Sequence, residues 1–206
     1  MSSIYDGVEK LGLQPDMQSW MSINSPVFEE LIHELKPKVI IEVGSWKGRS
    51  AIKMAELTKD YGTTIYCCDT WLGATEHILD DKRDYKFPTS HGYPMIYFQF
   101  LVNVKSSGHH ERIIPVPNTS MDCARILYHR KVRADLIYID ADHTAKGAFD
   151  DMTAYWELFA NPAKRVMFGD DYITFPGVAD AAKEFCKQHN LKAPVVKDPM
   201  WIIRND

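Results

Sequence analysis

Two short apolar runs that each end in paired carboxylates constrain this chain more than any other feature. DLIYIDADH covers residues 135–143 and RVMFGDDY covers residues 165–172. Both runs are β-branched or aromatic in character and bounded by polar residues, which is typical of buried parallel strands. If the strands are neighbours, one sheet edge collects four aspartates: Asp140, Asp142, Asp170 and Asp171. Such carboxylates repel one another unless a cation, a proton or a hydrogen-bond donor compensates them, and a divalent cation is the simplest compensation.

Strand-like and helix-like segments alternate along most of the chain. We expect strands at 38–43, 63–69, 111–117, 134–139 and 165–168, and two short extended runs at 192–196 and 200–204. We expect helices at 26–35, 50–59, 94–105, 119–128, 147–159 and 177–189, the third begun by Pro94. This alternation predicts an α/β fold, with a doubly wound, mostly parallel seven-stranded sheet that carries helices on both faces.

The length of the chain predicts a single domain. Its 206 residues, 45% of them hydrophobic, suffice for one substantial core. We interpret residues 1–24 as a polar N-terminal leader and residues 25–206 as the domain. Residues 70–93 are rich in charge, histidine and glycine without a clear period, which predicts a loop or lid that faces an acceptor.

Charge and cysteine usage exclude several classes of partner. The formal net charge is -4, and the chain has no long run of lysine or arginine. Binding to nucleic acid or to a membrane surface is therefore not expected. No apolar stretch approaches the roughly 20 residues that cross a bilayer. The four cysteines form no CxxC pair, and the amino terminus lacks an apolar signal segment. We therefore expect a reduced, cytoplasmic protein that binds a small molecule.

Polar residues follow nearly every expected strand, where ligands bind in doubly wound sheets. The turn EVGSWKGRS carries Gly44 and Gly48 but lacks both the full GxGxxG and a phosphate-binding GKS or GKT. Alone it is as typical of a plain strand-to-helix turn as of a cofactor site. Asp69 ends the second strand, where an acid either accepts the hydroxyls of a ribose or caps a helix. Together these features favour an adenosine without a polyphosphate, such as S-adenosylmethionine.

The ordered set of motifs resembles the class I S-adenosylmethionine methyltransferases, particularly the divalent-metal-dependent small-molecule O-methyltransferases. EVGSWKGRS looks like their glycine motif ExGxxxG, and CCDTW looks like their ribose-binding strand end. YIDADH and FGDDY look like their two metal-binding segments, and GVADAAKEFCKQHN with WIIR is similar to their closing helix and strand. The likeness covers about residues 25–204 and implies a Rossmann-like methyltransferase fold. Catechol-type relatives often carry Asp-Asn where this chain has Asp170 and Asp171, so the likeness is greater to sugar and macrolide-sugar members.

The resemblance implies two groups of binding residues. The cofactor would contact Glu42, Gly44, Ser45, Gly48, Ser50, Asp69, Thr70, Asn118, Thr119, Ser120 and Asp140. The metal would be held by Asp140, Asp170 and Asp171. An all-oxygen site favours Mg2+, with Mn2+ or Ca2+ as substitutes.

The implied reaction is Mg2+-assisted methylation of a hydroxyl on a small molecule, and that molecule is a sugar or a natural-product glycoside. His143 follows the acidic pair and titrates near neutrality, which makes it a candidate base. Asp142 either orients His143, contacts the cofactor or acts as the base itself, and Lys146 is a third candidate. Five side chains of the loop or lid are candidates for contact with the acceptor: Trp71, His77, Tyr85, His91 and Tyr93.

Other functions share some of these motifs. DADHT fits the DxDxT pattern of haloacid-dehalogenase-type phosphatases, but four expected strands precede it and only about sixty residues follow. A DxD metal-dependent glycosyltransferase is a second alternative, although the chain is short for that fold. A non-catalytic nucleoside-binding module leaves the acid cluster unexplained. A homo-oligomer with contacts through the leader is also compatible with the sequence.

Overall fold

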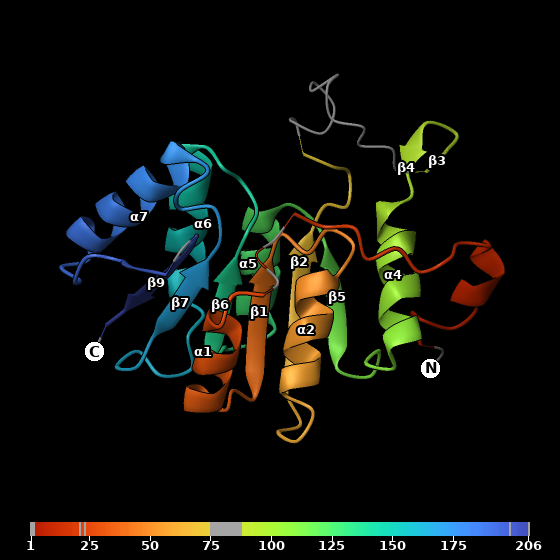
Figure 1. The fold of residues 1–206 in the computed structure, drawn as a ribbon, viewed down its shortest axis with the longest axis horizontal. Helices are drawn as coiled ribbons and strands as arrows, with labels where there is room; N and C mark the ends of the chain where they lie inside the picture. The colour runs from red at the N-terminus through yellow and green to blue at the C-terminus, as the bar shows by residue number, and fades with distance from the viewer. Residues whose placement is uncertain (1–2, 21, 23, 75–87, 198, 206) are drawn as a thin grey trace.

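A seven-stranded sheet forms the centre of the protein, with strand order β5-β2-β1-β6-β7-β9-β8 (Figure 1). A computed structural model describes residues 3–20, 22, 24–74, 88–197 and 199–205. The strands are β1 (Val39–Val43), β2 (Thr64–Asp69), β5 (Ile113–Pro117), β6 (Leu136–Ile139), β7 (Val166–Gly169), β8 (Val195–Lys197) and β9 (Met200–Arg204). The first five strands in the sheet order run parallel, whereas β9 is antiparallel to β7 and β8 to β9.

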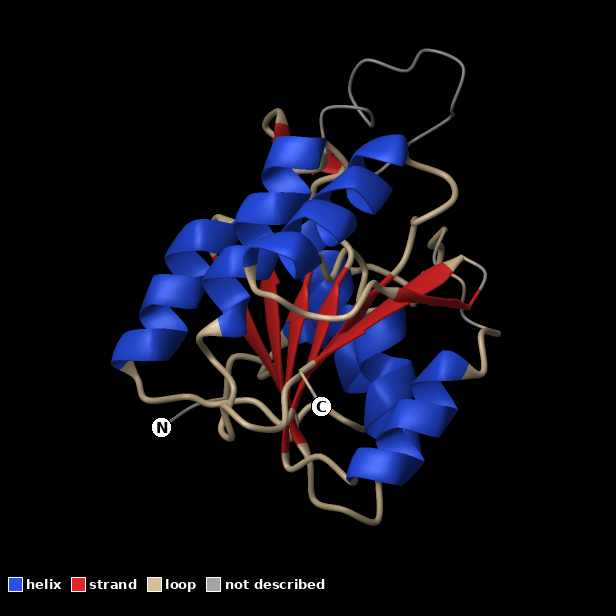
Figure 2. Ribbon diagram, turned by 90° about the vertical axis from the view of Figure 1, so that its left-hand side faces the viewer, coloured by secondary structure: helices blue, strands red, loops and turns tan. Residues whose placement is uncertain are grey.

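Helices cover both faces of this sheet, as Figure 2 shows with the sheet seen nearly edge-on. One face carries α1 (Val27–Leu35), α2 (Arg49–Leu57) and α4 (Ile96–Ser107). The other carries α5 (Ser120–His129), α6 (Ala145–Trp156) and α7 (Pro176–Gln188). Consecutive strand residues such as Ile40 and Ile41 point to opposite faces, and both are fully buried. The predicted fold class and all seven expected strands are therefore confirmed.

Helix boundaries near the site follow local capping chemistry. The Thr119 side chain accepts a hydrogen bond from the Asp122 amide at the start of α5, and Thr144 does the same for the Gly147 amide at α6. The expectation that Pro94 begins a helix was wrong. Pro94 belongs to β4 (Tyr93–Pro94), which pairs with β3 (Thr89–Ser90), and α4 begins at Ile96 after this hairpin.

The leader packs against the domain along much of its described length. It contains the 3-10 helix η1 (Val8–Leu11) and joins the same core as α4 through the buried Tyr5 and Val8. The Tyr5 hydroxyl donates to the carbonyl of Ile113, 2.8 Å away. From η1 the chain crosses the upper edge of the sheet in Figure 1 before it enters α1.

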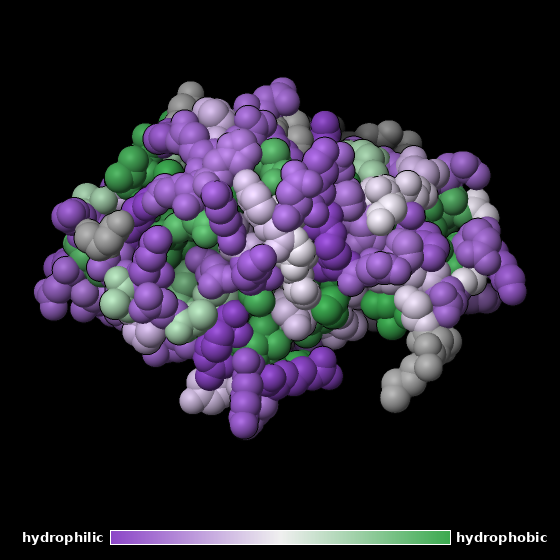
Figure 3. All heavy atoms as spheres, turned by 90° about the horizontal axis from the view of Figure 1, so that it is seen from below, coloured by the Kyte–Doolittle hydropathy of each residue, from purple (hydrophilic) through white to green (hydrophobic). Residues whose placement is uncertain are grey.

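The opposite edge of the sheet has a different surface. Seen from below in Figure 3, this face is mostly hydrophilic, with small and separate apolar areas. Within the described ranges, no helix combines the length and the apolar character that a membrane crossing requires. The hollow that could receive a ligand lies at the upper edge instead.

Candidate functional site

A cavity of about 790 Å³ opens at the carboxyl edge of the sheet, where the strand order reverses between β1 and β6. Ligands of doubly wound folds bind at this position. The sequence-predicted residues that line it are Gly44, Ser45, Ser50, Asp69, Thr70, Thr119, Ser120, Asp140, Asp142, His143 and Asp171. The remaining predicted residues lie beside or beneath the lining: Glu42, Gly48, Asn118, Lys146 and Asp170.

Gly44 brings the loop after β1 against the end of β6. Its φ of 86° lies in the left-handed region, and a Cβ atom there would stand 1.9 Å from the carbonyl oxygen of Asp140. Gly48 also has φ 86°, and its Cβ would meet the Phe100 ring at 2.9 Å. A side chain at either position would move the loop, so both glycines set how closely the backbone approaches the cavity.

Asp69 organises this loop through its carboxylate. Oδ2 accepts the amides of Ser45 at 2.9 Å and Trp46 at 2.8 Å, and Oδ1 accepts the amide of Trp71 at 2.7 Å. Burial raises the pKa of Asp69, and these backbone hydrogen bonds oppose the rise. Since a carboxylate offers about four acceptor positions, only a small remainder is available for a ribose.

Glu42 lies beneath the loop and is fully buried. Its Oε2 accepts a hydrogen bond from the Ser45 hydroxyl, while Oε1 has no hydrogen-bond partner among the described residues. Burial raises the pKa of Glu42 to about 7, although the Ser45 hydroxyl lowers it. A buried acceptor without a donor lowers the free energy of unfolding by about 1–3 kcal/mol. Such an unpaired atom is typical of a site where a bound ligand supplies the donor.

Asp140, His143 and Asp171 converge at the other end of the cavity. One ligand atom from each lies within 4.8 Å of the others. His143 Nε2 is 3.1 Å from Asp171 Oδ2 and 3.8 Å from Asp140 Oδ1. The buried Tyr138 hydroxyl donates to Asp140 Oδ2 at 2.9 Å, and the His143 ring stacks on Phe175 with centroids 4.2 Å apart.

The charge of this group is balanced by His143. Burial lowers the pKa of His143, but the hydrogen bonds and charges of Asp140 and Asp171 outweigh it and raise the pKa to about 10. The imidazolium thus supplies the compensation that adjacent carboxylates require. Two carboxylates and one imidazole are also a donor set that binds divalent cations.

Asp170 is placed differently from its neighbour Asp171. Its carboxylate accepts the amide of Ser22 at 2.8 Å and the amide of Asp171 at 2.8 Å, and only 4% of the residue is exposed. Burial and the charge of Asp140 raise its pKa. Asp171 has φ 68°, which strains a non-glycine residue and is often retained at functional sites. The structure therefore groups Asp140 and Asp171 with His143 and sets Asp170 behind them.

The two other candidate bases have local partners. Asp142 Oδ1 accepts the amide of Thr144 at 2.7 Å, and the carboxylate fills the space that a side chain at Gly147 would need. Lys146 is exposed, pairs with Asp150 and lies outside the cavity lining. Of the three candidates, His143 is the one that faces both carboxylates.

The adenine end of the predicted cofactor site lies at α5. Thr119 and Ser120 line the cavity, whereas the Asn118 side chain turns back to accept the amide of Thr119 at 2.9 Å. The Ser120 hydroxyl is bound by Asp151, whose pKa burial raises to about 6. The Thr119 hydroxyl also has a local partner, the Asp122 carboxylate at 3.0 Å, so this end offers two hydroxyls held by acids and one buried acid.

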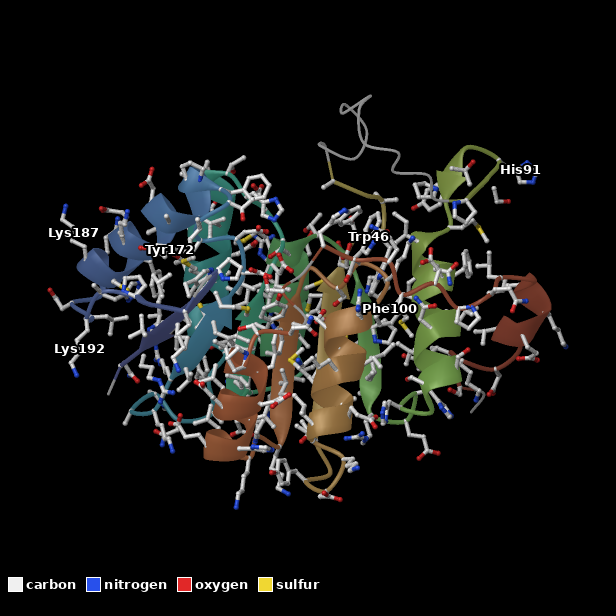
Figure 4. All side chains as sticks on the ribbon, viewed as in Figure 1. Trp46, His91, Phe100, Tyr172, Lys187 and Lys192 are labelled. Atoms are coloured by element: carbon white, nitrogen blue, oxygen red, sulfur yellow. The ribbon has the colours of Figure 1, made fainter. Side chains whose placement is uncertain are left out.

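The three described acceptor candidates, Trp71, His91 and Tyr93, do not line the cavity. Trp71 is 1% exposed and donates from its indole nitrogen to the carbonyl of Trp46 at 2.7 Å. His91 and Tyr93 belong to the β3–β4 hairpin, and Figure 4 places His91 well apart from Trp46. Neither lines the cavity. The two other candidates, His77 and Tyr85, lie outside the described residues.

Several lining residues were not anticipated from the sequence. Ser19 and Trp20 reach the cavity from the leader, and Trp46 and Arg49 reach it from the glycine loop and the start of α2. The rings of Trp20 and Trp46 have centroids 5.4 Å apart. The position of Trp46 between two glycines was the one sequence signal, because an aromatic residue in such a turn has little local reason to be there.

The fold is similar to that of several solved methyltransferases. An O-methyltransferase from Bacillus cereus, solved in complex with SAH, shares 13% identity at a TM-score of 0.62 over 97% of this chain and 89% of that one. TomG, an O-methyltransferase from Streptomyces achromogenes solved with SAM, shares 10% sequence identity at a TM-score of 0.61, over 98% of this chain and 88% of that one. CalS11, a TDP-rhamnose 3'-O-methyltransferase of calicheamicin biosynthesis, shares 18% sequence identity at a TM-score of 0.59, over 86% of this chain and 77% of that one. Among curated proteins, no sequence matches this chain.

A family model described as a methyltransferase domain matches residues 41–172. The matched region contains the glycine loop, Asp69 and both acidic strand ends, including the DADHT segment that also fits a phosphatase or a glycosyltransferase motif. The match covers more than half of the chain, and the seven-stranded fold agrees with it. The chain belongs to the methyltransferase domain family.

Proposed function

We propose that this methyltransferase transfers the methyl group of S-adenosylmethionine to a hydroxyl of a small molecule, a sugar or a natural-product glycoside, with the help of a divalent cation, Mg2+. One observation carries the proposal: a single cavity joins the glycine loop to the group formed by Asp140, His143 and Asp171. A methyl donor held at the loop and an acceptor hydroxyl held at the acids would lie next to each other.

The charge of the cavity suits a cationic cofactor. Arg49 is the one lysine or arginine among the described lining residues, against six aspartates: Asp69, Asp140, Asp142, Asp150, Asp151 and Asp171. S-adenosylmethionine carries a sulfonium and an ammonium, and both are attracted to carboxylates. The buried Oε1 atom of Glu42, beneath the same loop, has no hydrogen-bond donor among the described residues. The volume of about 790 Å³ lies in the range of small-molecule sites.

The donor set also fits a hard divalent cation. Asp140 and Asp171 would hold it, with Asp170 and His143 beside them. When bound, such an ion lowers the pKa of a substrate hydroxyl and fixes its direction of attack. The Tyr138 hydroxyl keeps one oxygen of Asp140 in place and leaves the other facing the cavity.

His143 is the side chain placed to take the acceptor proton. Its Nε2 atom lies at the two carboxylates, and its ring is held by stacking on Phe175. In the protonated form it balances their charge; in the neutral form, with that balance supplied by a bound cation, it accepts a proton. The glycine loop and Asp69 keep the donor in line with this group.

The structural neighbours support the proposed cofactor and acceptor class. Two were solved with SAH or SAM, and CalS11 is described as a TDP-rhamnose 3'-O-methyltransferase. The adjacent Asp170 and Asp171 of this chain resemble the sugar-directed branch rather than the catechol-directed one. These likenesses support the proposed substrate class, and the arrangement of the cavity supports the proposed reaction.

The test combines ligand binding with methyl transfer. S-adenosylhomocysteine without metal should raise the unfolding temperature, because a ligand that binds only the native state stabilises it. Mass spectrometry should then detect methylation of TDP-rhamnose or a methyl glycoside with Mg2+, and none with excess EDTA. Absence of both the thermal shift and any methylated product would contradict the proposal. Methylation that persists in EDTA would remove the metal from it.

A further inference from the structure

Trp20 gives the cavity an aromatic wall that comes from the leader. The residue lines the cavity together with Ser19, and 53% of it is exposed. Its ring lies against Trp46 of the glycine loop, with an angle of 50° between the ring planes. Trp46 in turn holds the cofactor loop, because its amide donates to Asp69. A large apolar ring left half exposed inside a ligand-sized cavity is a surface that a ligand can cover.

The segment that carries Trp20, residues 14–20 together with Ser22, we name the leader strap. Asn103 of α4 is fully buried, and its side chain forms two hydrogen bonds with the backbone of Asp16. It accepts from the Asp16 amide at 2.8 Å and donates to the Asp16 carbonyl at 2.7 Å. The buried Gln99 donates to the carbonyl of Gln14 at 2.8 Å and to Asn103 Oδ1 at 3.0 Å. Buried amides that pair with one backbone segment fix its position along the chain, since a shift would leave them unsatisfied.

A second anchor joins the strap to the cofactor loop. Lys47 has a side chain that is 4% exposed, and its Nζ atom lies 2.6 Å from Asp16 Oδ2 and 3.1 Å from Gln18 Oε1. Asn103 also donates to the carbonyl of Lys47 at 2.8 Å. A buried ammonium with no partner is costly, so this ion pair resists opening.

A third anchor lies on the far side of Trp20. The Ser22 amide donates to Asp170 at 2.8 Å, and its hydroxyl lies 3.3 Å from the same carboxylate. Asp170 immediately precedes Asp171 of the acid group. Trp20 is thus fixed between a contact to the glycine loop and a contact to the end of β7.

We infer that the leader strap is part of the active site and that Trp20 forms the wall on which the ring of a pyranose acceptor packs, with its hydroxyls toward Asp140 and Asp171. The inference rests on the proposed function. The polar residues near Trp20 favour a sugar over a phenol: Ser19 and Arg49, whose Nη1 atom lies 3.5 Å from the Ser19 hydroxyl, line the same cavity and can bind hydroxyls. A pyranose offers an apolar C–H face to an indole and hydroxyls to those side chains, whereas a phenol ring offers few hydroxyls to them.

Trp20→Ala tests the wall directly. The holoprotein is assayed with S-adenosylmethionine and Mg2+ against TDP-rhamnose, methyl rhamnoside and catechol. We expect KM for the pyranose acceptor to rise about tenfold, with kcat and the Kd of S-adenosylhomocysteine unchanged, and Trp20→Phe to recover part of the loss. Ile4→Ala is the matched control, because Ile4 is an exposed apolar residue of the same leader outside the cavity lining.

The outcomes separate the inference from the proposed function. An unchanged KM for the pyranose acceptor in Trp20→Ala would contradict the role of Trp20 as the acceptor wall. If catechol is methylated and neither pyranose acceptor is, the sugar assignment is wrong. Failure of the wild type to bind S-adenosylhomocysteine would instead contradict the proposed function. An unfolding temperature equal to that of the wild type confirms that the half-exposed Trp20 is dispensable for folding.

Gln99→Ala tests the strap as a positioning device. Gln99 is buried in α4 and contacts the strap and Asn103, and it does not line the cavity. We expect amide hydrogen exchange at residues 14–20 to become faster and the acceptor KM to rise about threefold at constant kcat. Faster exchange at the strap with an unchanged KM would show that the strap is only structural.

Discussion

The two ends of the cavity hold their carboxylates in opposite ways. At the end of β2, Asp69 gives both of its oxygens to backbone amides of the glycine loop. At the ends of β6 and β7, Asp140 and Asp171 face each other across His143, and their compensation is a proton. The first end is held by neutral donors built into the chain, and the second is held by charges that a ligand can replace.

This difference separates structure from chemistry within one cavity. The loop end is preorganised, so it should keep its shape whether or not a ligand is present. The acid end is a charge balance, so removal of one member should change what the site binds and catalyses more than how the protein folds. Substitutions at the two ends are therefore expected to give different pairs of readouts.

The largest effect is expected at the acid end, from Asp171→Ala. Loss of one of the two converging carboxylates removes a donor from the proposed cation site, so methyl transfer should fall below detection while S-adenosylhomocysteine still binds. Product is measured by mass spectrometry, and the Kd of S-adenosylhomocysteine by calorimetry. Asp180→Ala, an exposed aspartate of α7, is the control. Activity of Asp171→Ala that equals the control would remove this residue from the site.

Asp170→Ala should also abolish turnover, and it distinguishes two roles. As a cation ligand, Asp170 would be needed for metal binding; as the partner of Ser22, it would be needed for the position of the leader strap. Ser22→Ala removes the hydroxyl contact and keeps the amide contact, so its turnover should stay close to wild type. If both variants lose activity equally, the contact with Ser22 is the important one.

A third large effect is expected from His143→Ala. Loss of the general base should lower kcat by about two to four orders of magnitude, the usual range for such a group. The Kd of S-adenosylhomocysteine should not change, because the glycine loop is untouched. His129→Ala, a histidine at the exposed end of α5, is the control. A loss in kcat below about threefold would exclude His143 from the proton transfer.

Tyr138→Phe gives an intermediate effect, because Tyr138 acts through Asp140. The hydroxyl that orients one oxygen of Asp140 is removed while the ring stays in the core, so apparent Mg2+ affinity should fall about tenfold. The measurement is a Mg2+ titration of binding by calorimetry, with kcat at saturating Mg2+ as the second readout. Tyr128→Phe, on an exposed tyrosine, is the control. Unchanged Mg2+ affinity would show that Asp140 needs no such support.

The elements of the fold were predictable because each depends on local pattern. The apolar runs that became β6 and β7, and the helix expected at 119–128 that became α5, can be recognised within a few residues. Pro94 was misplaced because proline is equally suited to a helix start and to an edge strand, and the pairing with Thr89 decides between them. Propensity alone does not contain that contact.

The site was predictable only as far as the rule for strand ends reaches. That rule places Asp69, Asp140 and Asp171 at one edge, where the structure has them. It does not reveal that Asp69 is largely occupied by backbone amides, or that Asp170 is bound by Ser22, 148 residues earlier in the chain. Contacts of this range arise from tertiary packing, which no local pattern of residues encodes. The role of the leader was hidden for the same reason.

The smallest effect is expected at the loop end, from Asp69→Asn. Asparagine keeps one acceptor oxygen but turns an amino group toward backbone N–H donors, so part of the loop loses its hydrogen bonds. An unpaired buried group costs about 1–3 kcal/mol, so the unfolding temperature should fall by several degrees. The Kd of S-adenosylhomocysteine should rise about threefold as the loop loosens, and kcat at saturation should not change.

Asp135→Asn makes this last experiment decisive, because Asp135 has the same task at the opposite edge of the sheet. Its carboxylate accepts the amides of Lys38 at 2.7 Å and Val39 at 3.0 Å, far from the cavity lining. Both variants should lower the unfolding temperature, and only Asp69→Asn should weaken ligand binding. A collapse of kcat in Asp69→Asn without loss of stability would make Asp69 a chemical group, and the contrast between the two ends of the cavity would then fail.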